Sequence, residues 1–170
     1  MRYGTITNGC SHAFLTAASP LNYAILSTLA TSQSEIMRIH IHRLEPHQDL
    51  KDSLVEIIHH SNINAGFVLS CVGSVSSVCL RMAGADRILR QEGPFEIVSL
   101  VGTLSQNGCH LHASFSDAEG RVIGGHVMSG CPIYTTAEIV LGQSLTHRLE
   151  RHFDPNTGYD ELVVYSESSQ

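Results

Sequence analysis

Apolar and polar residues along this chain alternate or form short apolar runs, and both patterns are typical of β-strands. Residues 38–44 alternate, which predicts a half-exposed strand with His40 and His42 together on its polar, solvated face. Residues 65–72 form an almost continuous apolar run, as expected for a buried strand that ends at Gly73. Further strands are expected over residues 75–82, 95–104, 133–141 and 162–165, with a short edge strand or loop over residues 88–91.

Residues 48–61 have helical rather than strand periodicity. Four apolar residues fall on one stripe, and Asp49 and Asp52 favour the N-terminal end of a helix. The stripe consists of Leu50, Leu54, Ile57 and Ile58. Residues 144–153 look like a short polar segment that leads into a turn. The whole pattern predicts an α/β (α+β) fold, a compact, mostly antiparallel twisted sheet of about six to eight strands with two or so helices.

The segment 109–126 predicts a β-hairpin that brings three imidazoles to one face of a sheet. His110 and His112 are alternate residues of one strand, so their side chains point the same way. Gly120 can adopt the positive φ angle that a three-residue hairpin loop needs, and such a loop places His112 directly opposite His126. A two-residue or four-residue loop would put His126 on the other face instead.

Three imidazoles on one face suggest a metal site at His110, His112 and His126. Neutral imidazole nitrogen is a good ligand for divalent metals, and we expect zinc first, with iron or nickel as alternatives. A site made only of histidines leaves a coordination position open for water or for a small-molecule ligand. The alternative interpretation is a hydrogen-bonded polar cluster, since the chain has 11 histidines and some clustering by chance is expected.

Two carboxylates lie within apolar strands, and each is expected to need a partner if it is buried. Glu96 could pair with Arg81 as a structural ion pair, or it could be an exposed glutamate. Glu138 could be half of a buried ion pair, a carboxylate ligand of the metal, a residue that supports the metal ligands, or a base. The ion pair or a hydrogen-bonded role is the interpretation that we favour for Glu138.

Length and charge narrow the possible partners. A chain of 170 residues suits a single domain, and a charged fraction of only 15% suggests that oligomerisation covers part of the surface. The net charge is −6 and the ten basic residues are scattered, which makes direct DNA binding doubtful. No stretch reaches the apolar length of a membrane span.

The cysteines indicate the cellular compartment, and the composition of the N-terminal segment indicates where the domain begins. Five cysteines without a Cys-x-x-Cys pair suggest reduced thiols and a cytoplasmic protein. Among the first 34 residues Arg2 is the only charged side chain, so we expect residues 1–34 to be an extension or a non-native start. The domain is then expected over residues 35–166, followed by a frayed tail, residues 167–170.

Four stretches stand in order within residues 37–164: Gly93–Thr103, His110–His112, Gly120–His126 and Tyr134–Val140. Together they resemble the PPC (plants and prokaryotes conserved) domain, which occurs alone in bacteria and archaea and beside AT-hooks in plant nuclear proteins. The resemblance implies a compact α/β domain, a homotrimer and, in some members, a metal held by these histidines. The Gly-Arg-Pro core of an AT-hook is absent from this sequence.

Three functional hypotheses follow. We favour a trimeric metal-binding module with a regulatory or interaction role, associated with DNA through other proteins. The second hypothesis is a metal-dependent hydrolase or lyase that acts on a small molecule, with Glu138, Glu96 or Asp117 as the base. The third is structural, with the imidazoles linking subunits.

Overall fold

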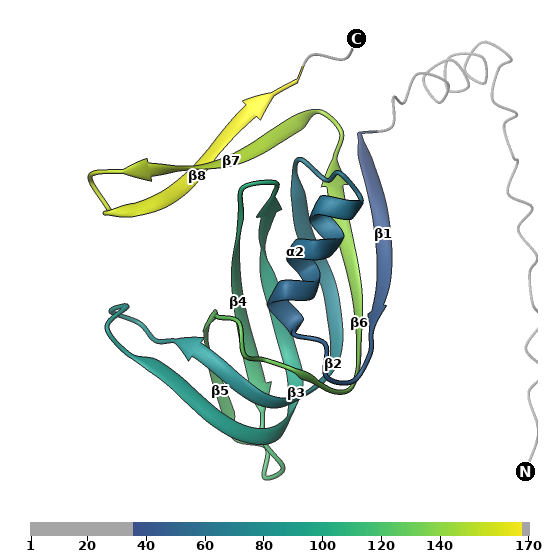
Figure 1. Ribbon diagram of the computed structural model, residues 1–170, viewed down its shortest axis with the longest axis vertical. Coiled ribbons are helices and arrows are strands. Elements are labelled where there is room, and N and C mark those ends of the chain that lie inside the picture. Colours follow the sequence, from purple (N-terminus) through teal and green to yellow (C-terminus); the bar gives the residue numbers. More distant parts are fainter. Residues whose placement is uncertain (1–35, 168–170) are drawn as a thin grey trace, which may run out of the picture. The chain divides into compact units, whose positions relative to one another are not determined.

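A six-stranded antiparallel sheet forms the body of residues 36–167, the part of the chain that this computed structural model describes (Figure 1). The strand order is β1-β6-β2-β3-β4-β5, and β2 also pairs with β5. The strands are β1 (Met37–Leu44), β2 (Gly66–Arg81), β3 (Ile88–Ser105), β4 (Gly108–Ser116), β5 (Val122–Val127) and β6 (Ile133–Ser144). The expected extension, residues 1–34, lies outside the described residues, as do residues 168–170 of the expected tail.

A separate two-stranded sheet follows, formed by β7 (His147–Asp154) and β8 (Tyr159–Ser166). The predicted, mostly antiparallel fold with six to eight strands is therefore confirmed. The described range contains one helix where two or so were expected, and it lies within residues 48–61, the stretch that has helical periodicity. That helix is too short and too polar to cross a membrane.

Helix α2 (Leu50–His60) packs across one face of the sheet (Figure 1). Its predicted apolar stripe is confirmed, because Leu50, Leu54 and Ile58 are fully buried in the core. Asp49 caps the helix by accepting hydrogen bonds from the amides of residues 51 and 52. Its second carboxylate oxygen accepts from the amides of Gly130 and Cys131. The cap therefore also ties the helix to the loop between β5 and β6.

Strand β2 continues through Gly73, so the prediction that a strand ends there is wrong. A Cβ atom at Gly73 would lie only 2.1 Å from the carbonyl oxygen of Thr136 in β6. Glycine is needed here because the two backbones approach closely, and the register between them shifts on either side. The glycine therefore marks an irregularity within a long strand and not its end.

The alternation in β1 was predicted correctly, but its faces are reversed. His40 and His42 are half-buried on the face that carries the buried Leu44, whereas Ile39 and Ile41 are exposed. Ile41 keeps 75% of its surface accessible. The reversal arises because the face of the sheet opposite α2 is itself apolar.

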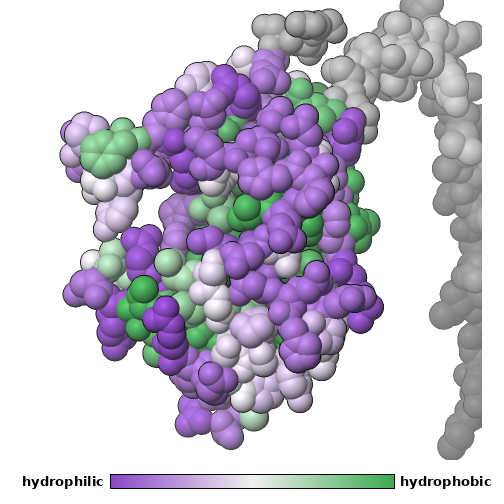
Figure 2. Space-filling view, viewed as in Figure 1, coloured by the Kyte–Doolittle hydropathy of each residue, from purple (hydrophilic) through white to green (hydrophobic). Residues whose placement is uncertain are grey.

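We call the face of the sheet that lies opposite α2 the outer face. Figure 2 views the molecule from the α2 side, which is covered mainly by hydrophilic residues. The outer face, by contrast, exposes large apolar side chains on β1, β2 and β3. They are Ile39, Ile41, Leu69, Val72, Val98 and Val101.

Candidate metal centre

The β4–β5 hairpin has the loop that its sequence predicts. The amide of Asp117 donates to the carbonyl of Arg121 over 3.0 Å, which leaves a three-residue loop, and Gly120 has a φ of 79°. The register that follows pairs His112 with His126. His126 therefore lies on the same face as the two histidines of β4, as predicted.

The three imidazoles converge on the outer face. The Nε2 atoms of His110 and His112 are 3.2 Å apart, and one ligand nitrogen from each of the three rings lies within 4.8 Å of the others. The ring of His126 is centred 5.1 Å from that of His110 and 5.6 Å from that of His112. All three histidines come from one hairpin, so the cluster forms within a single chain.

The donor set fits a tetrahedral metal with an open position. Two Zn–N bonds of about 2.1 Å at tetrahedral angles place their nitrogens roughly 3.4 Å apart, close to the His110–His112 spacing. The Nδ1 atom of His126 is buried without a hydrogen-bond partner among the described residues. A metal bound at that nitrogen would satisfy a buried polar atom that is otherwise costly.

The surroundings keep two of the imidazoles neutral. Burial, followed by the positive charge of Arg81, lowers the pKa of His126 to about 4. Burial, followed by the charge of Arg151, also lowers the pKa of His110, although Glu161 acts in the opposite direction. Only a neutral imidazole has a free lone pair, so these shifts favour metal binding at neutral pH.

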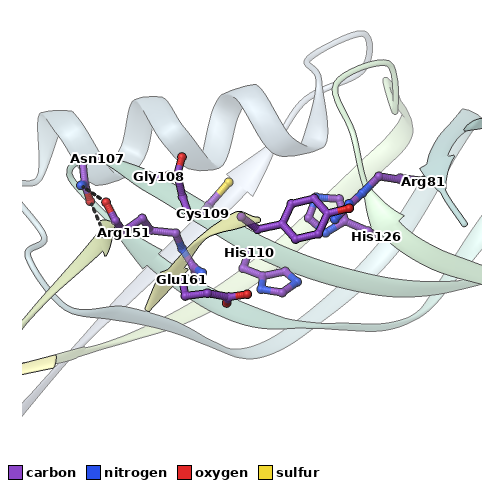
Figure 3. Close-up of a pocket in the computed structure, with 10 residues that line it drawn as sticks. Arg81, Asn107, Gly108, Cys109, His110, His126, Arg151 and Glu161 are labelled. Atoms are coloured by element: carbon purple, nitrogen blue, oxygen red, sulfur yellow. Dashed lines mark hydrogen bonds between the residues drawn. The ribbon is translucent and has the colours of Figure 1, made fainter. Parts of the chain in front are cut away.

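A cavity of about 310 Å³ lies between the cluster and the β7–β8 hairpin (Figure 3). His110, His126 and Arg81 line it from the sheet, and Arg151, Tyr159 and Glu161 line it from the hairpin. Strand β7 was not predicted, because residues 144–153 were expected to be a polar segment and not a strand. The predicted turn at residues 154–158 and the predicted strand over residues 162–165, which lies within β8, were the local signs of a hairpin.

The expected ion pair between Arg81 and Glu96 does not form among the described residues. Glu96 is exposed and lies opposite Ser74 in the register of β2 and β3, whereas Arg81 lies opposite Ile88. Arg81 and Glu96 are therefore separated by roughly 23 Å along β2, at about 3.3 Å per residue. Arg81 instead stacks over the ring of Tyr159, with 5.4 Å from its Cζ atom to the ring centroid. Glu96 stays exposed because it alternates with the buried Phe95 and Ile97, so its side chain points to the outer face.

Glu138 is also exposed, and it forms no ion pair within the described part of the chain. It lies in β6, three strands from β4, or about 14 Å from the histidines at roughly 4.8 Å per strand. Asp117 is occupied at the hairpin loop, where it accepts hydrogen bonds from Arg121. Neither carboxylate is placed to act at the cluster.

The sequence is similar to part of a much longer curated protein. It is 48% identical over 128 residues to the bifunctional protein GlmU of Synechococcus sp. strain JA-3-3Ab. The match covers 75% of this chain and 21% of that protein. This chain therefore spans about a fifth of the curated relatives that it matches.

Solved structures share the fold. A hypothetical protein from Salmonella cholerae-suis is 36% identical with a TM-score of 0.75, over 79% of this chain and 97% of that one. The metal-containing protein AF0104 from Archaeoglobus fulgidus is 26% identical with a TM-score of 0.64, over 76% and 95%. A candidate DNA-binding protein from Bacteroides thetaiotaomicron is 19% identical with a TM-score of 0.66, over 74% and 91%, which shows the fold alone.

A family model also matches, and it spans the whole six-stranded sheet together with α2 and the three histidines. The match covers residues 31–144, and the resemblance expected from the sequence is confirmed. The chain belongs to the Plants and Prokaryotes Conserved (PCC) domain family.

Proposed function

We propose that this chain binds one divalent metal ion through His110, His112 and His126. The observation that carries the proposal is the convergence of three imidazole nitrogens within 4.8 Å on one face of one hairpin. The buried, unpartnered Nδ1 of His126 and the lowered pKa values of His110 and His126 support it. A similar archaeal structure belongs to a protein that is named as metal-containing.

Zinc suits this donor set best. Zinc accepts three histidines with a fourth position for water or ligand, whereas non-haem iron sites commonly include a carboxylate ligand. No carboxylate joins the ligand group within residues 36–167. Iron and nickel remain the alternatives that a metal competition would separate.

We also propose that the chain assembles as a homotrimer through its outer face. Exposed apolar side chains on adjacent strands are unusual for a monomer surface and mark interaction sites. Val101 lies directly opposite His112, so an interface on this face would border the metal centre. The family resemblance supplies the expected number of subunits.

The role that we propose is regulatory or interactive. The matched part of GlmU is one segment of a longer bifunctional protein, which fits a domain that accompanies other activities. The net charge of −6 does not favour direct contact with DNA, so any association with DNA would pass through other proteins. The four cysteines among the described residues are free thiols, which supports a reducing, cytoplasmic setting.

One observation favours a second candidate, a metal-dependent hydrolase or lyase. The cavity next to the histidines carries Glu161, a carboxylate on the side of His110. A metal with an open position can lower the pKa of bound water, and a nearby carboxylate can accept its proton. Glu161 therefore replaces Glu138, Glu96 and Asp117 as the base in this alternative.

The metal proposal is tested by zinc titration of the full chain after removal of metal by a chelator. We expect one zinc ion per chain, and a fall in affinity of more than about 100-fold in His112→Ala, because losing even a supporting partner of a ligand costs 10–100-fold. The matched control is His152→Ala, which removes an exposed histidine that bonds to Glu150. Equal zinc affinity in the wild type and His112→Ala would refute the site.

A further inference from the structure

The cavity beside the histidines is built from two parts of the chain that are far apart in sequence. Residues of β2, β4 and β5 form its floor, and residues of the β7–β8 hairpin form its opposite wall. In Figure 3 the ring of His110 lies next to the carboxylate of Glu161, and His126 lies beside Arg81. Its volume of about 310 Å³ is at the lower limit for sites that bind small molecules.

Arg151 is held firmly at the edge of this cavity. Its backbone amide donates to Oδ1 of Asn107 and its carbonyl accepts from Nδ2 of the same side chain, both over 3.1 Å. The guanidinium donates from Nη2 to the hydroxyl of Thr103 over 2.7 Å. Its Nε is buried without a hydrogen-bond partner among the described residues, so one donor of a fixed guanidinium still lacks an acceptor.

Arg81 provides a second cation, on the side of the cavity that the sheet forms. It pairs with His126 in the sheet, which places its side chain on the outer face, and its guanidinium stacks on Tyr159. Neither Arg81 nor Arg151 forms an ion pair with a carboxylate in residues 36–167. Two positioned but unpaired guanidinium groups are a typical arrangement for binding a carboxylate or phosphate.

Glu161 limits what else the ligand can be. It lines the same cavity as His110, and Figure 3 shows its carboxylate next to the ring of that histidine. A carboxylate repels a bare anion but accepts hydrogen bonds from hydroxyl groups. The cavity is therefore suited to a molecule with an anionic group at one end and a hydroxyl group at the other.

We propose that this cavity binds a small hydroxylated organic anion, whose carboxylate or phosphate group is held by Arg81 on one side of the cavity and whose hydroxyl group contacts Arg151 and Glu161 on the other. The inference rests on the proposed metal site in one respect only, since such a ligand would lie beside the open coordination position. The arginines and Glu161 do not depend on the metal.

The test is calorimetric titration of the full chain, with and without zinc, using four probes. Glycerol 3-phosphate and malate are hydroxylated anions, glycerol is the neutral counterpart, and inorganic phosphate is the bare anion. We expect glycerol 3-phosphate or malate to bind, glycerol not to bind, and inorganic phosphate to bind more weakly. Arg151→Met should weaken the binding at least about 10-fold, as expected for loss of a charged hydrogen bond.

Arg148→Met is the matched control. Arg148 lies in the same strand but contacts Tyr165 and Glu150 outside the cavity, so its removal should leave binding unchanged. If Arg151→Met does not fold, as judged by its melting transition, Arg81→Gln tests the second cation in the same way. Glu161→Gln should weaken the binding of glycerol 3-phosphate more than that of inorganic phosphate.

The two proposals fail separately. If zinc binds but no probe binds, or if Arg151→Met and Arg148→Met bind equally, the anion site is wrong and the metal site stands. If a hydroxylated anion binds in an Arg151-dependent manner and zinc does not bind, the metal site is wrong and the anion site stands. Equal affinity for inorganic phosphate and glycerol 3-phosphate would overturn the proposal of an organic ligand.

Discussion

His42 of β1 has a buried ring nitrogen, Nε2, without a hydrogen-bond partner in the described part of the chain. Its ring stacks parallel to that of His40, with 6.5 Å between the centroids, and His40 is hydrogen-bonded to Gln143. Burial, followed by the proximity of His40, lowers the pKa of His42. Protonation of His42 is therefore less favourable in the folded protein than in the unfolded chain.

This difference predicts a loss of stability in acid. The unfolded chain takes up a proton near pH 6.5, while folded His42 resists it, so stability is present above that pH and falls as the pH drops through the lower, folded pKa. In metal-free protein, His42→Leu should reduce the difference between the urea midpoints at pH 7.5 and pH 5.0. His60→Gln, which removes an exposed histidine, should keep the wild-type difference. An unchanged difference in His42→Leu would contradict the prediction.

At the scale of single residues, the sequence was informative where the outcome depended on local geometry. The convergence of His112 and His126 follows from one loop, and the loop length follows from Gly120. The partners of Glu96 and Glu138 could not be inferred, because their burial depends on which face of the sheet packs against α2. That choice is made by the whole sheet and not by the neighbours of either residue.

At the scale of secondary-structure elements, Gly102 controls how closely β3 approaches the histidine strand. It pairs with Leu111, between the two histidines of β4, and its φ is 155°. A Cβ atom there would lie 2.0 Å from the carbonyl oxygen of His110. Any side chain at this position must therefore push the backbone of β4 away and shift His110.

We expect Gly102→Ala to cost more than about 2 kcal/mol of unfolding free energy and to weaken zinc binding. Gly120→Ala is the control, because Gly120 also has a positive φ but a Cβ atom there meets nothing within 4 Å. Gly120→Ala should lower the free energy of unfolding only by the roughly 1–2 kcal/mol that an alanine costs in the left-handed conformation, and it should keep the metal site. Urea unfolding and zinc titration measure both effects. Similar losses in the two variants would show that close strand packing at Gly102 is unimportant.

The β7–β8 hairpin shows where element prediction fails. The turn at residues 154–158 suggested a hairpin, but the sequence did not show where this hairpin packs against the six-stranded sheet. Asn107 and Arg151, which fasten it to the β3–β4 turn, are far apart in sequence. A contact of this kind leaves no periodic pattern, so the cavity that it creates could not be predicted from the chain alone.

At the scale of the whole molecule, the outer face decides between a monomer and an assembly. Val72 is 57% exposed in β2, and two strands away, across β6, Ile41 is 75% exposed in β1. Burying a valine side chain contributes about 1.5–3 kcal/mol, and in a symmetric trimer each position acts three times. A charge at the same position would instead have to be buried without a partner.

Val72→Glu should therefore convert a species of three times the chain mass, measured by light scattering after gel filtration, into monomers. Val164→Glu is the matched control, because Val164 is similarly exposed but belongs to the β7–β8 hairpin and not to the six-stranded sheet, and it should leave the trimer intact. Since all three histidines come from one hairpin, the Val72→Glu monomer should still bind zinc. A wild-type monomer, or a trimer that survives Val72→Glu, would refute this interface. Loss of zinc together with the trimer would mean that the histidines link subunits, as the structural hypothesis requires.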